Sequence, residues 1–169
     1  MNGNIFLLSR SGKVNFFTSQ YCTSRSLKTI MTVLDSIINK YTGKSFNITD
    51  YHGDNEFDKA ALKDFLQPGL FHAYGRNEHV GPIERPVHTI KERCRSTCNR
   101  IPYRRITFLM VRSPVEGVTD MINAFPSKTG ISKSLSPSTI AEGKPKLDLS
   151  RPMKARLISS HLSTAHQGL

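Results

Sequence analysis

The chain has few cysteines, no tryptophan and no long apolar run, and each of these shortages excludes a structural or functional feature. Three cysteines in 169 residues are too few, and odd in number, for a disulfide framework, which favours a reducing intracellular compartment. No apolar stretch approaches the ~20 residues that a membrane-spanning helix needs. The first residues carry no basic segment ahead of their apolar run, so they do not make a signal peptide. Without tryptophan, the sequence also lacks an easy aromatic marker of a base-stacking surface.

Acidic side chains are scarce as well. Thirteen Asp and Glu stand against 24 Lys and Arg, which leaves a formal net charge of +11 and a pI near 9.9. A polyanion is therefore the first partner to consider, because neutralising phosphates with Lys and Arg releases counterions. The length and the 37% apolar content suit one domain with a real core and a tail. We expect this domain to span residues 1–126, and a linker and basic tail to span residues 127–169.

The charges are unevenly placed along the chain. Residues 84–113 hold eight basic side chains against two acidic ones, whereas residues 48–64 hold five acidic against two basic. A basic stripe beside an acidic pocket is typical of metal-dependent nucleases, in which carboxylates from different elements hold the metals. Asp54 and Glu84 are the candidate metal ligands, and their hard oxygens suit Mg²⁺ or Mn²⁺. The alternative is that Asp54 lies in a solvated turn before a helix.

Periodicity and turn residues predict an α/β chain. The first half of the chain should contain a hairpin of Ile5–Ser9 and Val14–Thr18, a helix over Ser26–Tyr41 and a strand over Ser45–Tyr51 that leads into Asp54; Ser24 or Ser26 should cap the helix, and Gly43 should end it. A helix containing Phe57 to Phe65, a strand over Leu70–Tyr74 and a loop over 75–81 should follow. The last expected elements are a helix within 81–98 and a helix over Arg105–Phe125, which Pro114 and Gly117 should kink or break. Residues 126–139 have a linker composition, and we expect most of residues 140–169 to be poorly ordered.

The helix within 81–98 is predicted to have two faces. One is apolar, with Val87, Ile90, Cys94 and Cys98, and the other carries Glu84, His88, Lys91 and Arg95 at spacings of four, three and four. A side chain that can hold a metal thus shares a face with side chains that can hold phosphates. An ordinary solvated face is the alternative. The candidate DNA-binding residues are Lys91, Arg95, His88, Arg85 and Arg93.

Cys94 and Cys98 raise a second metal hypothesis. Together with His79 and His88 they could form a zinc site, but their order and spacing match no structural zinc signature. Two small buried residues on one helix face is the alternative reading.

Several separate segments resemble one protein family. They are H-G-D-N-E-F (52–57), N-E-H-V-G-P-I-E-R (77–85), T-I-K-E-R-C-R (89–95), M-I-N-A-F-P (121–126) and S-P-S-T-I-A-E-G-K-P (136–145). In this order they are similar to the integrase catalytic core of copia-type long-terminal-repeat retrotransposons. The resemblance covers roughly residues 1–147. It implies a ribonuclease H-like three-layer core, with a mixed sheet flanked by helices.

The resemblance also implies a chemistry. Asp54 resembles the second carboxylate of the family's Asp, Asp, Glu triad, Glu84 resembles the third, and Lys91 matches a position that contacts DNA phosphates. Such enzymes use metal ions for 3′-end processing and strand transfer. The resemblance implies DNA as the partner, no small-molecule substrate and a nuclear location by family role, and it leaves a homodimer open.

Three features depart from the family pattern. The first acidic residue, Asp35, falls inside a predicted helix, so we expect that the strand bearing the initial Asp is missing or incomplete and that the chain is truncated at its N-terminus. Only 29 residues separate Asp54 from Glu84, and Glu92, with 37 between, is the alternative third carboxylate. Pro86 and Pro114 fall in predicted helices; Pro86 is tolerable only if its helix begins near Glu84.

These features lead to one main hypothesis and two alternatives. The main hypothesis is a DNA-binding integrase core fragment that is inactive without its first Asp. The first alternative is a basic nucleic-acid-binding or protein-interaction domain with no catalytic past. The second is a retroelement relic that never folds stably.

Overall fold

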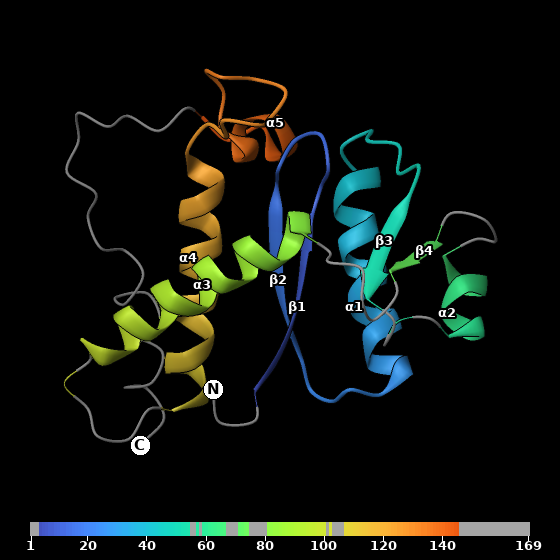
Figure 1. Cartoon of the computed structure of the whole chain (residues 1–169), viewed down its shortest axis with the longest axis horizontal. Coiled ribbons are helices and arrows are strands. Elements are labelled where there is room, and N and C mark those ends of the chain that lie inside the picture. The colour runs from blue at the N-terminus through green and yellow to red at the C-terminus, as the bar shows by residue number, and fades with distance from the viewer. Residues whose placement is uncertain are drawn as a thin grey trace. The chain divides into compact units, whose positions relative to one another are not determined.

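The computed structural model describes residues 4–54, 57, 59–66, 71–74, 81–100, 102 and 107–145, and the chain is mixed α/β as predicted. The elements in these residues, labelled in Figure 1, are β1 (Ile5–Arg10), β2 (Phe17–Cys22), α1 (Leu27–Thr42), β3 (Tyr51–Asp54), α2 (Ala60–Phe65), β4 (Phe71–Tyr74), α3 (Gly81–Asn99), α4 (Phe108–Ala124) and α5 (Pro137–Glu142). No helix in this part of the chain combines the length and the apolar character of a membrane span.

The contacts divide the chain into two units. One contains β1 as far as Ser9, β2 from Gln20, and the chain onward to Thr89; the other contains residues 10–19 and the chain from Ile90. The division cuts β1, β2 and α3, so each of these elements contributes to both units.

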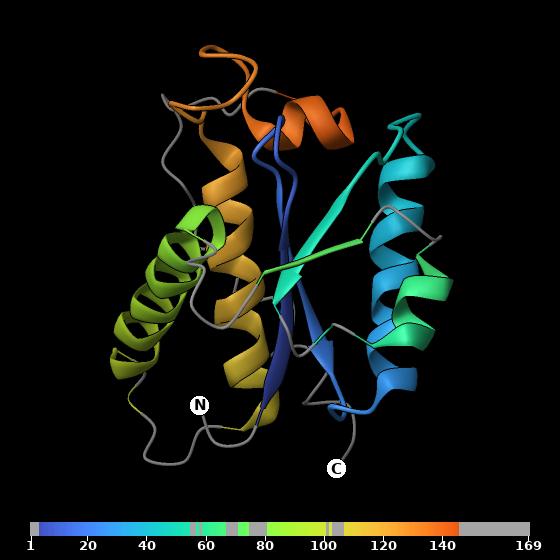
Figure 2. The ribbon, with the colours of Figure 1, turned by 45° about the vertical axis from the view of Figure 1, so that its right-hand side comes forward.

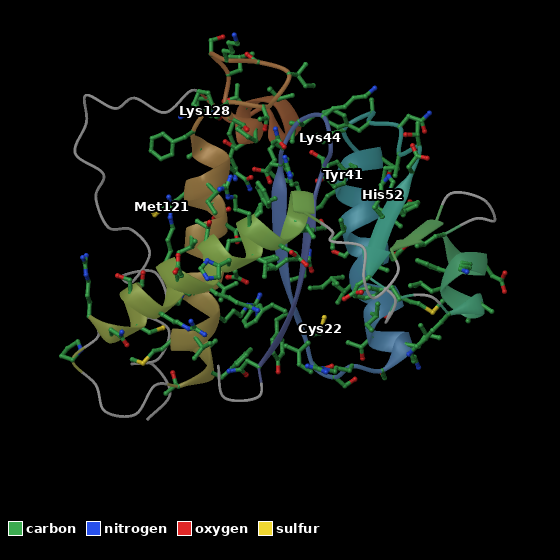
Figure 3. The ribbon with its side chains drawn as sticks, in the orientation of Figure 1. Cys22, Tyr41, Lys44, His52, Met121 and Lys128 are labelled. Atoms are coloured by element: carbon green, nitrogen blue, oxygen red, sulfur yellow. The ribbon has the colours of Figure 1, made fainter. Side chains whose placement is uncertain are left out.

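In the first unit, α1 packs on the two strands. Its length follows from its caps, because the Ser26 side chain accepts a hydrogen bond from the Thr29 amide and Gly43 follows the last turn. The cap at Ser26 and the stop at Gly43 are confirmed. The helix buries Val33 and Ile37 against Cys22, with Tyr41 at the margin (Figure 3). α2 contacts α1, as Figure 2 shows, and buries Leu62 and Leu66.

The same unit contains a parallel pair of strands. β3 and β4 pair in register from Tyr51 opposite Phe71 to Asp54 opposite Tyr74. Parallel strands place their carboxyl ends at the same edge. Asp54 is the last residue of β3, as predicted, so it lies at the edge where β4 also ends.

In the second unit, α4 is continuous through Pro114 and Gly117, so the predicted break is wrong. Thr107 caps its start, and Val111, Val115 and Val118 bury one face at spacings of four and three. This burial offsets the missing amide of Pro114, which costs about 3 kcal/mol in a helix interior.

Two asparagines connect segments of this unit that are more than 100 residues apart. The side-chain amide of buried Asn123 accepts from the Phe17 amide at 2.8 Å and donates to the Phe17 carbonyl at 2.7 Å. Asn15 accepts from Arg10 and donates to the hydroxyls of Ser127 and Thr129, at 3.1 and 3.2 Å. The hairpin is thus held to α4 and to the chain just after it.

The hairpin turn is longer than predicted. β2 begins at Phe17 and not at Val14, because Asn15 takes a left-handed backbone conformation with φ of +57°. The amide of Ser11 donates to the Phe16 carbonyl and closes the turn. Val14 and Phe16 remain buried, which explains why their pattern resembles a strand.

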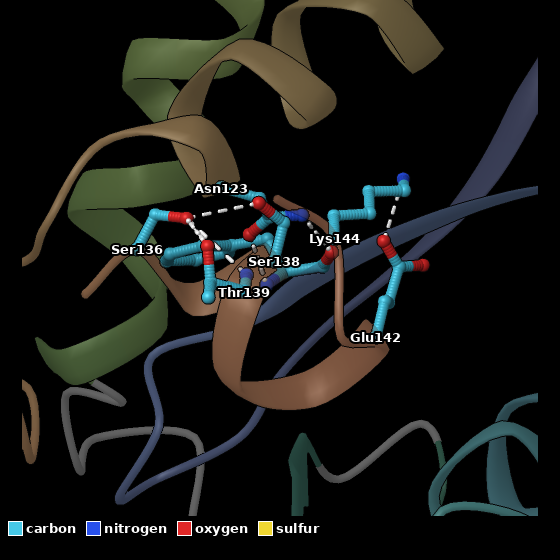
Figure 4. Close-up of polar contacts among 7 residues, drawn as sticks. Asn123, Ser136, Ser138, Thr139, Glu142 and Lys144 are labelled. Atoms are coloured by element: carbon cyan, nitrogen blue, oxygen red, sulfur yellow. Dashed lines mark hydrogen bonds and ion pairs between the residues drawn. The ribbon is translucent and has the colours of Figure 1, made fainter. Parts of the chain in front are cut away.

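Three other boundaries differ from the predictions. Residues 46–50 are not in a strand, so β3 begins at Tyr51; the left-handed Ser45, at φ of +61°, precedes this stretch. α3 begins at Gly81, so Pro86 lies inside it and not in the first turn. Helix α5 covers the end of the predicted linker and the first residues of the tail that was predicted to be poorly ordered; it contacts α4 and is capped by Ser136 (Figure 4). The domain boundary at residue 126 stays a prediction, and residues 146–169 lie outside the described residues.

The amide of Asn123 gives a first prediction. Replacing Asn123 with Ala leaves the buried Phe17 amide and carbonyl without their partner, and each unsatisfied group costs ~1–3 kcal/mol. We expect urea unfolding to show a loss of ~2–5 kcal/mol in the free energy of unfolding. The control is Asn39→Ala, which removes only an exposed hydrogen bond to Asp35 and should change stability by less than ~0.5 kcal/mol. Equal losses in the two variants would contradict this role.

Candidate metal and nucleic-acid site

Asp54 lies at the carboxyl end of β3. Side chains alternate along a strand, and here Tyr51 and Gly53 are half-buried whereas His52 and Asp54 are exposed on the other face. Figure 3 labels His52 on this strand. His52 therefore shares the exposed face of Asp54, which the alternation of the sequence could have indicated. Burial raises the pKa of Tyr51, on the opposite face.

Glu84 lies in the first turn of α3 and is exposed. α3 follows β4 in the chain, and β4 is the parallel neighbour of β3. Both predicted metal ligands therefore follow the carboxyl ends of paired parallel strands, where open α/β sheets bind their ligands. The predicted loop over residues 75–81 lies, except for Gly81, outside the described residues. Among the side chains that the structure describes, no three of His, Cys, Asp and Glu group in a way that could hold a metal ion.

The two predicted faces of α3 are confirmed. Ile90 and Cys94 are 3% and 1% exposed, and Val87 and Cys98 beside them are half-buried. Glu84, His88, Lys91 and Arg95 are all exposed, and they lie on a flank of the helix, about 110° around its axis from Ile90 and Cys94. We call these four residues the α3 stripe. At ~100° per residue, all four fall within about 60° of arc around the helix axis.

The other predicted residues lie elsewhere around α3, although all are exposed. Arg85 and Glu92 fall about 100° and 80° from Glu84, on one flank of the stripe, and Arg93 falls about 180° from it. Glu92 is also about 12 Å farther along the axis than Glu84. A ligand centred on the α3 stripe would thus contact Lys91 and Arg95. Arg85 would lie at the edge of such a ligand, and Arg93 would face away from it.

The zinc hypothesis receives no support from the thiols. Burial, and secondly charge on Cys98, raise the pKa of Cys94 to about 11. A zinc ligand must be a thiolate, which this environment disfavours. Cys94 and Cys98 fit the alternative of a buried pair on one helix face; His79 lies outside the described residues.

The fold of this chain is similar to that of a solved protein core. The catalytic core domain of BIV integrase, solved in crystal form I, aligns with a TM-score of 0.56 over 84% of this chain and 88% of that one. The chain has an integrase catalytic-core fold. Because the two sequences are only 14% identical, the likeness concerns the fold alone. No protein-family model matches the sequence, and the comparison with curated proteins found no match.

The expected likeness to an integrase catalytic core is thus confirmed at the level of the fold, whereas the three-layer core and the missing first strand stay predictions and the sheet differs. Within the described residues the strands form two separate two-stranded sheets, β1–β2 and β3–β4, and not one continuous mixed sheet. The copia-type assignment and the roles of Asp54 and Glu84 stay predictions.

The thiols give a second prediction. In the native chain at pH 8, iodoacetamide should modify half-buried Cys98 first, because a thiol with a pKa of about 11 is only ~0.1% thiolate there. The modification rate of Cys94 should still rise between pH 9 and pH 10, since its folded-state pKa lies above this range. Mass spectrometry of digested samples measures each site, and the chain unfolded in guanidinium is the control. Zinc-dependent protection of Cys98 would instead support a metal site.

Proposed function

We propose that this chain is a copia-type integrase core fragment that binds DNA through the α3 stripe and does not catalyse strand transfer by itself. The observation that carries the proposal is the α3 stripe, in which one carboxylate is followed by three side chains that can contact phosphates. Its rigidity comes from the buried face of Ile90 and Cys94 on the same helix. The net charge of +11 favours a polyanion as the ligand.

Asp54 and Glu84 are the residues that would hold a metal ion. The exposed carboxylates of Asp54, at the end of β3, and of Glu84, in the first turn of α3, offer the hard oxygen ligands that Mg²⁺ and Mn²⁺ prefer. A bound ion would supply Lewis-acid polarisation of a phosphodiester. Glu84 fits this role better than Glu92, because it lies in the first turn of α3, on the stripe of Lys91 and Arg95.

The positions of the acidic residues in the described part of the chain support the proposal of inactivity. β1 and β2 contain no acidic residue, and Asp35 lies exposed on α1, where it accepts a hydrogen bond from Asn39 at 3.1 Å. The division into two strand pairs supports the absence of a central strand, within the residues that the structure describes. With one carboxylate fewer, electrostatic stabilisation of a phosphoryl transition state falls by orders of magnitude. The nuclear location and the homodimer stay predictions from the resemblance.

DNA binding provides the third prediction. Replacing Lys91 and Arg95 together with Ala should weaken binding to duplex DNA and reduce the slope of log K against log salt by ~0.9 for each lost phosphate contact. Fluorescence anisotropy across a salt series measures both quantities.

Two control variants match this experiment. Lys28→Ala with Lys40→Ala removes the same charge from exposed positions on α1, and Arg93→Ala removes charge from the far side of α3. Both should leave the slope nearly unchanged. If the α1 variant reduces it as much as the stripe variant, binding is diffuse and the proposed surface is wrong.

Metal binding provides the fourth prediction. The 169-residue chain should show no Mg²⁺-dependent strand transfer on donor DNA ends, yet it should bind Mn²⁺ weakly in calorimetry. Asp54→Asn and Glu84→Gln should each reduce that binding, whereas Asp64→Asn, on exposed α2, should not. Glu92→Gln tests the alternative ligand. Strand transfer that Asp54→Asn abolishes would contradict the inactivity.

A second candidate is a basic nucleic-acid-binding domain without a metal site, since the described side chains include no group of three potential metal ligands. It predicts that the α3 stripe binds DNA while Mn²⁺ binding is insensitive to Asp54 and Glu84. The calorimetric experiment therefore separates the two candidates.

A further inference from the structure

The chain between α4 and α5 exposes large apolar side chains. We call residues 125–136 the α4–α5 loop. Phe125, Ile131 and Leu135 are 41%, 65% and 42% exposed, and they are half of the large apolar side chains found exposed in the described residues. Large apolar side chains that gather on a surface mark interaction sites, and these three belong to one loop.

The same loop is positively charged. No acidic residue occurs between Asp120 and Glu142, and Glu142 forms an ion pair with Lys144 at 2.6 Å (Figure 4). Lys128, labelled in Figure 3, and Lys133 are exposed in the loop. The loop therefore offers cationic and apolar side chains together.

Hydrogen bonds fix the loop at its beginning. Ser127 and Thr129 accept from the Asn15 side chain in the hairpin turn, which carries a further exposed lysine, Lys13. Gly130 packs so closely here that a Cβ would lie 3.3 Å from the Ser127 Cβ and 3.4 Å from Asn15 Nδ2. A side chain at residue 130 would disturb this contact.

The end of the loop is fixed as well. The Ser132 hydroxyl accepts from the amides of Ser134 and Leu135, and Ser136 caps α5 through the Thr139 amide. A loop ordered before binding loses less conformational entropy when a partner binds.

We propose that the α4–α5 loop is a docking surface for an acidic peptide segment of another protein that carries apolar anchors. Phosphates of a nucleic acid would satisfy Lys128 and Lys133 but would leave Ile131 and Leu135 in water. An acidic segment with leucine- or phenylalanine-like side chains satisfies both sets. This surface uses neither Asp54, Glu84 nor the α3 stripe, so it does not depend on the proposed function.

The fifth prediction tests this surface by peptide selection. A displayed library of random 12-residue peptides is selected on the full chain, and enriched peptides are synthesised with a fluorophore for anisotropy. We expect them to combine Asp or Glu with large apolar residues. Lys128→Ser with Lys133→Ser, and separately Ile131→Ser with Leu135→Ser, should each weaken binding about tenfold or more.

The controls use equally exposed residues elsewhere and the same measurement. Lys28→Ser with Lys40→Ser and the single change Leu109→Ser, 58% exposed on α4, should leave peptide binding unchanged. Unchanged thermal unfolding shows that each variant is folded. No selected binder, binders without acidic residues, or binding insensitive to both loop variants would overturn the proposal. Duplex DNA should bind the loop variants and the parent chain equally. If the loop variants lose affinity for DNA and no peptide binds the loop, the loop is a nucleic-acid surface and the proposal is also overturned.

Discussion

The side-chain amide of Asn123 forms hydrogen bonds with both backbone groups of Phe17, as a neighbouring strand would. The other constraints of this unit follow from it. With α4 held at Phe17, the chain just after α4 lies within reach of Asn15, whose left-handed backbone directs its side chain to Ser127 and Thr129. A buried amide with both groups bonded is specific, because any displacement would leave the buried backbone groups of Phe17 without their hydrogen-bond partners. The apolar face of α4 contributes buried apolar surface, and the hydrogen bonds of Asn123 fix where α4 lies relative to Phe17.

Helix α3 links the packing to the function. Its two buried residues, Ile90 and Cys94, are one turn apart and set the rotation of the helix about its axis. The spacing of the sequence determines which side chains align with Glu84, and the rotation of the helix leaves them exposed. Arg93 is as basic as Arg95, yet it lies on the other side of the axis. The basic side chains of α3 are therefore not equivalent, and the proposed phosphate contacts fall to Lys91 and Arg95 rather than to Arg93.

How much the sequence could predict depends on the range of the interactions. The period and caps of α1 are local, so Ser26 and Gly43 marked it correctly, and the faces of α3 followed from spacing. The turn at Asn15 could not be predicted, since its partners lie 112 and 114 residues away. Helix α5 carried a readable signal in Ser136 followed by Pro137, a cap residue and a favoured first position, but its six residues are too few for periodicity. Asp54 at a strand end was predictable; the parallel pairing of β3 with β4, the strand that precedes α3 and Glu84, is a long-range interaction that no local pattern reports.

Binding and catalysis differ in how they respond to a missing group. Each phosphate contact adds its own counterion release, so DNA binding declines in steps as basic residues are lost. Two-metal chemistry has no such steps, because the ions must hold the attacking and the leaving oxygens at once and every bridging carboxylate is needed. A chain with a basic stripe on α3, a carboxylate at the end of β3 and another in the first turn of α3, but none on β1 or β2, is thus proposed to bind DNA without catalysing strand transfer. The same fold can in this way pass from enzyme to binding protein without any change in its packing.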